Sequence, residues 1–412
     1  MAVGLITAPL QARALGPDGR GMLAAIMVPV SLAPWVAGLG LGVFAMREAA
    51  RGRSSGELIG TIGAASMLPG AIVVLLAVPI ASFFSDGRDT VFTFLLIGLL
   101  LVPVALLADI LWRVATGLEQ WRRVIAVRLI PAVTGGVAIV VLYVLDSLTV
   151  SSSAIVLLIG GVLSIVPLVP ILRTAAPLRF SRSLAAEGFR FGSRAWITTL
   201  TSLANVRLDQ LIMIRLVSAR ELGLYAVAAT IAAFSASFTA ALGTALFPRV
   251  AGGEVKLAAR SLRTALAGVV FASILLALVT PLLLSVLFGS RFDDAAPMVW
   301  ILLAAGIPLA GLTVLRDVIT SAGMPGSAAR AELIALLITI PGIFLLVPSL
   351  GGVGAAIVSA AAYSLSFGYL LFVCHRRFAT PYSEFLLLRG SDVRWAMARV
   401  RGRRLGRRGL GG

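Results

Sequence analysis

The sequence predicts an all-α integral membrane protein with about twelve transmembrane helices in two six-helix bundles, which are related by a parallel pseudo-two-fold repeat. Three observations carry this prediction: the composition, the length of the apolar runs, and the distribution of arginine. Of the 412 residues, 59% are hydrophobic and 13% are charged, and the mean hydropathy is +1.02. Soluble domains contain about 25% charged residues. The chain therefore has too few charges to cover a water-exposed globule.

The apolar runs have the length of membrane crossings. A hydrocarbon core of about 30 Å needs about 20 helical residues, and each crossing must be a helix because lipid offers bare backbone no hydrogen bonds. The first run is too short, since Arg13 ends it, and we expect the natural chain to start upstream of Met1. The predicted spans are 1–12, 22–45, 58–83, 91–112, 124–145, 153–173, 194–214, 222–248, 264–289, 295–316, 331–348 and 352–374.

Basic residues are concentrated in alternate loops. The net charge of +17 comes from 35 Lys and Arg against 18 Asp and Glu. Of the 35, 28 fall in one set of loops and the C-terminal tail, six fall in the other set, and Arg207 alone lies deep in a span. Because short cytoplasmic loops hold the positive excess, both termini are predicted to be cytoplasmic. The charge then reflects topology, and no nucleic-acid partner is predicted.

An internal repeat relates the two halves of the chain at an offset of 202 residues. The strongest coincidences are Arg13 with Arg215, Gly21 with Gly223, and Arg47 with Arg249. Six spans are an even number, so both halves have the same orientation and the repeat is parallel. The predicted organisation is a first bundle at 1–173, a cytoplasmic linker at 174–193, a second bundle at 194–374 and an Arg-rich cytoplasmic tail at 375–412.

The predicted span 194–214 carries the most polar side chains, which are costly at membrane depth and therefore candidates for function. Arg207 either binds a substrate phosphate with its guanidinium group or caps carbonyl groups and extends toward Arg215. At about 100° per residue, Thr198, Ser202, Asn205 and Asp209 share one helix face. The candidate substrate-binding residues are Arg207, Asp209, Asn205, Ser202, Gln210, Arg13 and Arg215.

Other charges have simpler interpretations beside the functional ones. Asp109 precedes Arg113 by four residues near a span end, which favours a structural pair over a gating or ion-coupling role. Arg13 and Arg215 lie at the outer mouths of equivalent helix pairs, where they guide an anion or meet lipid headgroups. The basic tail segment 399–408 predicts binding to anionic lipid.

Several motifs are absent from the sequence. It contains no G-x-x-x-x-G-K-[ST], CxxC or HExxH pattern, and Cys374 and His375 are its single cysteine and histidine. We therefore predict no catalytic residue, no metal and no cofactor. No predicted external loop exceeds about ten residues, which leaves no room for the catalytic loop of a membrane polymerase or glycosyltransferase.

Four segments carry a resemblance to a known family. They are ARALGPDGRG at 12–21; GFRFG at 188–192 with RLDQLI at 207–212 and LGLYAVA at 222–228; LFPR at 246–249; and GGVGAA at 351–356. With them, nearly the whole chain resembles the polysaccharide-type lipid-linked oligosaccharide flippases of the multidrug/oligosaccharidyl-lipid/polysaccharide (MOP) exporter superfamily. The resemblance implies a cationic cavity between two bundles that opens to each side in turn. It also implies Arg207 as a pyrophosphate contact and Asp209 as a gating or ion-coupled group.

The predicted function is non-enzymatic translocation of a polyprenyl-diphosphate-linked oligosaccharide across the bacterial plasma membrane for surface polysaccharide synthesis. Its partners would be this glycan, membrane lipids, and glycosyltransferases or a polymerase of the same pathway. The main alternative is a cation-coupled multidrug antiporter, which needs a buried carboxylate in the first bundle, where Asp109 is the one candidate. A membrane glycosyltransferase and a non-transporting partner of a glycan assembly complex are further alternatives.

Overall fold

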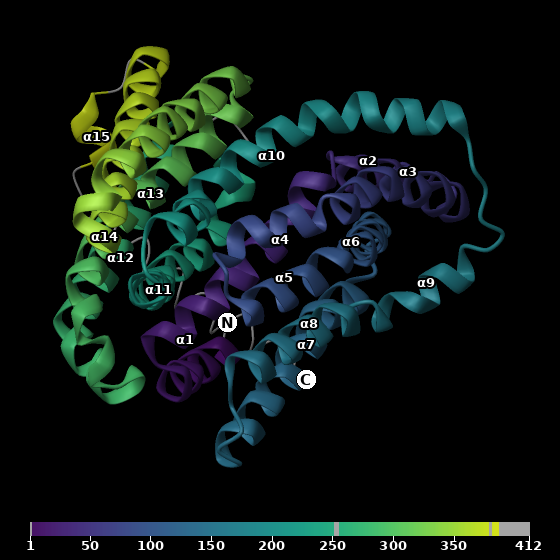
Figure 1. The fold of residues 1–412 in the computed structure, drawn as a ribbon. Helices are drawn as coiled ribbons and strands as arrows, with labels where there is room; N and C mark the ends of the chain where they lie inside the picture. Colours follow the sequence, from purple (N-terminus) through teal and green to yellow (C-terminus); the bar gives the residue numbers. More distant parts are fainter. Residues whose placement is uncertain (1, 251–254, 379–380, 387–412) are drawn as a thin grey trace, which may run out of the picture. The chain divides into compact units, whose positions relative to one another are not determined.

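The structure is a computed structural model that describes the backbone of residues 2–250, 255–378 and 381–386, with their side chains except at 2, 5, 195, 197–206, 235–250 and 255–258. Within these ranges the chain is helical and contains no strand (Figure 1). Seven described helices are long and apolar enough to cross a membrane, or eight if one bent pair counts as a span. The predicted all-α membrane fold is therefore confirmed.

The helices follow the order of the predicted spans (Figure 1). The first part of the chain forms α1 (Ala2–Ala37), α2 (Leu41–Ala50), α3 (Ser55–Leu75), α4 (Ala77–Ser85), α5 (Asp89–Leu100), α6 (Val102–Gly117), α7 (Trp121–Val144), α8 (Val150–Leu163), η1 (Val166–Leu168) and α9 (Val169–Thr174). The second part forms α10 (Arg182–Leu216), α11 (Ala219–Val250), α12 (Val255–Leu283), η2 (Leu284–Phe288), η3 (Ser290–Ala295), α13 (Ala296–Ser321), α14 (Pro325–Phe378) and α15 (Tyr382–Leu386).

Helix α14 is two membrane crossings joined at a glycine. Its 54 residues would extend about 80 Å as one straight helix, far more than a bilayer. Gly351 interrupts it with φ 55° and ψ −136°. The Ser366 hydroxyl donates to the Ala331 carbonyl across this break at 2.8 Å, so the two segments run back alongside each other. Similarly, Gly16 (φ 66°, ψ 179°) divides α1 between the first two predicted spans.

The ends of the helices agree with the predicted repeat. Gly16, where α1 breaks, is equivalent at an offset of 202 to Ser218, which separates α10 from α11. Val150 begins α8, and its equivalent Gly352 begins the second segment of α14. The repeat detected in the sequence is therefore present in the positions where helices begin and end.

Three predicted spans are broken inside the apolar run. The span 22–45 is interrupted between α1 and α2, where Leu39 and Gly40 have φ of 45° and 68°. The breaks between α3 and α4 and between α5 and α6 each precede a proline, Pro79 or Pro103. Proline cannot donate to the carbonyl four residues earlier and so bends the helix; the second of these bends is 45°. Helix α10 also begins within the predicted linker 174–193.

The chain forms two compact units. Unit 1 is Met1–Val227 with Leu284–Asp294, and unit 2 is Ala228–Leu283 with Ala295–Gly412. Unit 1 thus contains α10, the first turns of α11 and the short helix η2. The bundle boundaries expected from the repeat stay a prediction.

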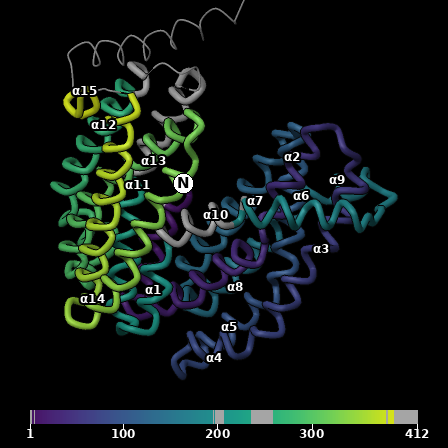
Figure 2. The backbone as a smooth tube through the Cα atoms, turned by 90° about the horizontal axis from the view of Figure 1, so that it is seen from above, coloured from purple at the N-terminus to yellow at the C-terminus, as the bar shows by residue number. Residues whose placement is uncertain are grey.

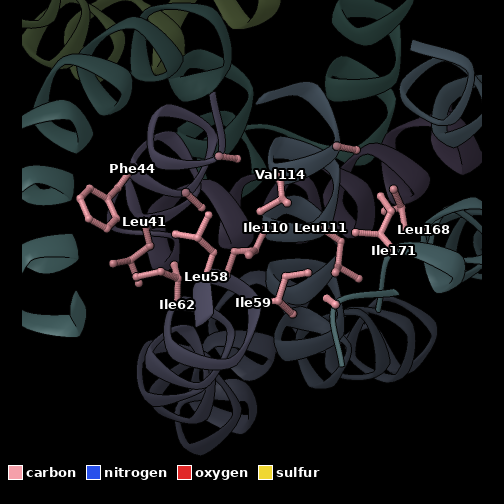
Figure 3. Close-up of a cluster of buried hydrophobic side chains, with 14 of the residues drawn as sticks. Leu41, Phe44, Leu58, Ile59, Ile62, Ile110, Leu111, Val114, Leu168 and Ile171 are labelled. Atoms are coloured by element: carbon pink, nitrogen blue, oxygen red, sulfur yellow. The ribbon is translucent and has the colours of Figure 1, made fainter. Parts of the chain in front are cut away.

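The core of unit 1 lies between α2, α3, α6, η1 and α9. The connection from α9 to α10 is held on α3, because the Arg179 backbone amide donates to the Gly56 carbonyl at 3.2 Å and the Thr61 hydroxyl donates to the Arg179 carbonyl at 3.2 Å. This contact fixes where α10 starts. Figure 3 shows the core side chains, which include Leu41, Phe44, Leu58, Ile59, Ile62, Ile110, Leu111, Val114, Leu168 and Ile171.

In unit 2, helices α12, α13 and α14 run side by side (Figure 2). The short helix α15 packs on α12, where the Arg263 guanidinium donates to the Glu384 carbonyl and Phe385 is buried. Arg316 Nε lies 3.9 Å from Asp317 Oδ1, and Arg316 also donates to Glu332 at 3.1 Å. Both contacts are structural ties within this unit.

Candidate functional site

The polar end of α10 separates into one exposed and two buried residues. Asp209 and Gln210 are buried, whereas Arg207 is exposed. The Tyr225 hydroxyl donates to the Asp209 carboxylate, and the Gln210 backbone amide donates to Asp209 Oδ1 at 2.7 Å. Asp209 therefore ties α10 to α11. Its predicted role in gating stays a prediction.

Arg207 donates to Gln210 and not to the hydrogen-bonded pair Asp209 and Tyr225. Among the described residues its hydrogen-bond partner is Gln210, at a long 3.4 Å from Arg207 Nη1 to Gln210 Oε1. Most of its guanidinium donors are therefore left to bind another group, as the phosphate hypothesis requires. The other predicted members of the polar face, Thr198, Ser202 and Asn205, have side chains outside those that the structure describes.

The turns of the two repeats meet in unit 1 through a pair of equivalent glycines. A methyl group on Gly21 would lie 1.8 Å from the Ala219 carbonyl oxygen, and one on Gly223 would lie 1.9 Å from the Pro17 carbonyl oxygen. At an offset of 202, Pro17 is equivalent to Ala219 and Gly21 to Gly223. The contact is therefore reciprocal, as at a two-fold axis, and it requires a residue without a side chain on both sides.

Arg13 crosses from the first repeat to the short helix η2. Its Nε donates to the Leu287 carbonyl at 3.0 Å, and its Nη2 donates to the Val286 carbonyl. The last carbonyl groups of a helix have no partner within the helix and attract positive charge. Arg13 therefore caps carbonyl groups at the end of η2.

Arg215 makes the equivalent crossing in the opposite direction. It pairs with Asp86, which follows α4, and its guanidinium carbon lies 5.1 Å from the centre of the Phe83 ring. Nearby, Arg220 pairs with Asp294 at 2.9 Å. These arginines lie at the end of the spans that the charge distribution assigns to the outside. We call the glycine contact with the Arg13 and Arg215 crossings the repeat clasp.

The clasp gives Arg13 and Arg215 partners within the protein. Sequence reasoning placed both at the outer mouths but did not find these partners, because a repeat shows which positions are equivalent and not which ones touch. Their predicted part in binding substrate stays a prediction.

A pocket opens at the opposite end of unit 1, where α1 bends into α2. Its volume is about 210 Å³, and its walls include Trp35, Trp196, Asp109 and Arg113. Arg113 Nε donates to both Asp109 carboxylate oxygens, at 2.8 and 3.1 Å. The predicted contact of Asp109 with Arg113 is therefore present, while the predicted role of Asp109 in gating or ion coupling stays a prediction. The two tryptophans were missed, although the Gly38-Leu39-Gly40 sequence could have indicated the bend that exposes them.

Comparison with known proteins identifies the family. Residues 10–297 match the polysaccharide biosynthesis protein family. The chain belongs to this family. A search of curated proteins finds no match to this chain.

Solved structures identify the fold. A multidrug resistance MATE family transporter of the MOP superfamily, in an inward-facing conformation, is 14% identical; the match covers 92% of this chain and 94% of that one, with a TM-score of 0.73. The lipid II flippase MurJ is 15% identical over 93% of this chain and 87% of that one, with a TM-score of 0.75. A MOP superfamily transporter from Pyrococcus furiosus is 14% identical over 92% and 95%, with a TM-score of 0.52. The resemblance to the MOP superfamily is therefore confirmed at the level of the fold, which this chain shares with these transporters.

The described part of the protein also bears on cation binding. It holds no group of three or more His, Cys, Asp and Glu side chains that could bind a metal ion. Asp109, the first-bundle carboxylate that a cation-coupled mechanism would need, is already occupied by Arg113.

Proposed function

We propose that this protein is a flippase that moves a polyprenyl-diphosphate-linked oligosaccharide from the cytoplasmic to the outer leaflet of a bacterial plasma membrane. The observation that carries the proposal is the match of residues 10–297 to the polysaccharide biosynthesis family. The MOP fold supports it, since a solved structure with that fold is a lipid II flippase. A lipid-linked glycan is the form in which a membrane transporter would meet a polysaccharide precursor.

The charged residues favour an anionic cargo. Arg207 keeps most of its donors available, and a guanidinium group matches the oxygens of a diphosphate. We propose Arg207 as the diphosphate contact, with Gln210 beside it on α10. Asp209 acts mainly as the tie to Tyr225, and its carboxylate is a secondary candidate for ion coupling.

The proposed setting follows from the arginine distribution. Both termini face the cytoplasm, and the basic tail binds anionic lipid. Glycosyltransferases or a polymerase of the same pathway supply and consume the glycan, and the protein itself performs no covalent chemistry.

A cation-coupled multidrug antiporter is the second candidate. The observation in its favour is the likeness to the MATE transporter, with a TM-score of 0.73. The pairing of Asp109 with Arg113 is against it, because a coupling carboxylate must be able to exchange its cation. The two candidates differ in the chemistry of what crosses the membrane.

Reconstituted translocation tests the proposal. The full chain is placed in liposomes that contain a fluorescent polyprenyl-diphosphate oligosaccharide, and an impermeant quencher reports how much of it reaches the outer leaflet. We expect the wild type to move the lipid and Arg207→Ala to lower the initial rate roughly tenfold or more, since a hydrogen bond to a charged group contributes about 1.5–3 kcal/mol.

Arg190→Ala is the matched control, because Arg190 is an exposed arginine on the same helix, α10. It removes the same charge and should keep the wild-type rate. Absence of lipid movement by the folded wild type, together with exchange of a cationic drug for protons, would replace the flippase by the antiporter. Equal rates in Arg207→Ala and wild type would remove Arg207 from the diphosphate site.

A further inference from the structure

The pocket at the bend between α1 and α2 has the size of one sugar ring. Its volume of about 210 Å³ is below the roughly 300 Å³ at which pockets for drug-sized ligands begin. It lies near Asp109 and Arg113, at the end of unit 1 that the arginine distribution assigns to the cytoplasm. A single small ring fits such a space, and a whole oligosaccharide does not.

Backbone geometry keeps this pocket open. Leu39 and Gly40 have positive φ and turn the chain between α1 and α2. A methyl group on Gly42 would lie 2.4 Å from both Asp109 Oδ2 and Arg113 Cδ. The glycine therefore leaves room for the charged pair, which forms part of the pocket wall.

The charged pair presents donors and acceptors together. Arg113 uses Nε for both bonds to Asp109, so its terminal Nη groups can donate to a ligand, and the carboxylate oxygens can accept further bonds. The side chains are 15% and 37% exposed. Because the pair is neutral overall, it does not select a lone cation or a lone anion. A hydroxyl group, which both donates and accepts, satisfies both members.

Two tryptophans supply the flat apolar part of the wall. Trp196 Nε1 donates to the Val36 carbonyl at 2.9 Å, which fixes the indole ring of α10 against the end of α1. Trp35 is 46% exposed and lines the pocket, so part of its indole ring is open to a ligand. Aromatic faces with a few convergent polar groups are the common lining of small-molecule sites. The C–H faces of a sugar ring fit against such indole rings.

We propose that this pocket is a carbohydrate subsite that binds one neutral sugar residue on the cytoplasmic side. The proposal rests on the proposed function, since it places part of the glycan headgroup at this pocket before translocation. Trp35 and Trp196 contact the ring faces, and Asp109 with Arg113 binds the hydroxyl groups. The pocket thereby contributes to which glycan is accepted.

Binding of simple glycosides tests the subsite directly. The full chain in nanodiscs is titrated with the methyl glycosides of glucose, galactose, mannose, rhamnose and N-acetylglucosamine, and binding is followed by saturation-transfer NMR and tryptophan fluorescence. We expect at least one glycoside to bind, Trp35→Leu to weaken it at least tenfold, and Trp35→Phe to retain most of it because an aromatic face remains.

Trp300→Leu is the matched control. Trp300 is 46% exposed, as Trp35 is, and it donates to the Ala277 carbonyl at 3.2 Å, as Trp196 does to Val36, but it lies in unit 2. It should leave glycoside binding unchanged. Failure of all five glycosides to bind, equal binding by Trp35→Leu, or displacement of the bound glycoside by sodium or pyrophosphate would each overturn the subsite.

The translocation assay separates this proposal from the proposed function. Lipid movement without glycoside binding would leave the flippase in place and remove the subsite. Glycoside binding that depends on Trp35, without lipid movement, would keep the sugar site and remove the flippase.

Discussion

Arg13 and Arg215 hold equivalent positions in the two repeats, yet they use different chemistry. Arg13 donates to main-chain carbonyl groups of η2, whereas Arg215 pairs with the Asp86 carboxylate and lies over the Phe83 ring. At an offset of 202, Val286 and Leu287, whose carbonyls Arg13 contacts, are equivalent to Phe84 and Ser85, the two residues before Asp86. Both arginines therefore contact equivalent segments of the two repeats. The position of the contact is the same in each repeat, but the groups that bind the arginine differ.

The two repeats also differ in the hydrogen bonds between their first two helices. Asp209 and Tyr225 form a buried tie in the second repeat, but their equivalents in the first repeat are Thr7 and Leu23, which cannot form one. The second repeat thus carries an extra polar connection between its first two helices. The shared features should matter equally in both repeats, and the features found in one repeat should matter in that repeat alone.

The largest effect is expected at the glycine contact, which the repeats share. Gly21→Ala and Gly223→Ala each place a methyl group within 2 Å of a backbone carbonyl oxygen, and backbone on both sides cannot move aside as a side chain can. Overpacking costs about 1–3 kcal/mol, and these substitutions should reach or exceed the upper limit. The yield of folded protein and its melting temperature in detergent should fall equally for both.

Gly161→Ala is the control for the glycine pair. Gly161 lies in α8 of the same unit, and nothing is within 4 Å of where its methyl group would be. Alanine should leave stability unchanged or raise it by up to about 1 kcal/mol, since it is the better helix former. A large loss from Gly21→Ala with none from Gly223→Ala would show that the contact is not reciprocal.

The sequence predicted which residues of the two repeats are equivalent, but it did not predict which of them are in contact. The offset of 202 came from Arg13, Gly21 and their partners, and the structure places those same residues in the clasp. The contact between them depends on how the helices pack in three dimensions. Aligning the sequence with itself gives no information about that packing. The helical wheel placed Asp209 on a polar face, but Tyr225 lies sixteen residues away and buries it.

Broken helices hid the pocket from sequence reasoning. Hydropathy shows where a chain can enter lipid, and the run 22–45 is apolar throughout, so it was predicted as one span. The bend depends on the φ values of Leu39 and Gly40, which a hydropathy average does not register. The prolines Pro79 and Pro103 were visible signals of the other two breaks, and their missing backbone donors explain those bends.

An intermediate effect is expected at the buried tie of the second repeat. Asp209→Ala removes the hydrogen bond that the buried Tyr225 hydroxyl donates to the carboxylate, and a buried hydrogen bond lost in this way costs about 1–3 kcal/mol. Tyr225→Phe removes the other member, and the double variant should lose less than the sum of the two. Melting temperatures of the four proteins in detergent give this coupling.

Thr7→Ala is the comparison in the first repeat, where no such tie can form. It should change the melting temperature far less than Asp209→Ala does. Additive losses in Asp209→Ala and Tyr225→Phe would mean that the two side chains stabilise the protein independently, and the asymmetry between the repeats would then lie elsewhere.

The smallest loss of stability is expected from substitution of Arg13 or Arg215, and its salt dependence should differ between the two. Arg215→Gln removes an exposed ion pair, with side chains 39% and 50% exposed, and such pairs contribute about 0.2–1 kcal/mol. Arg13→Gln removes two bonds to carbonyl groups and should cost somewhat more, about 1 kcal/mol or above.

Raising the salt from 0.1 M to 1 M shortens the Debye length from about 10 Å to about 3 Å. The loss from Arg215→Gln should therefore shrink in high salt, while the loss from Arg13→Gln persists, because a carbonyl group carries no net charge to screen. Equal salt dependence of the two variants, measured by melting temperature, would mean that the repeats use the same chemistry at this crossing despite their different partners.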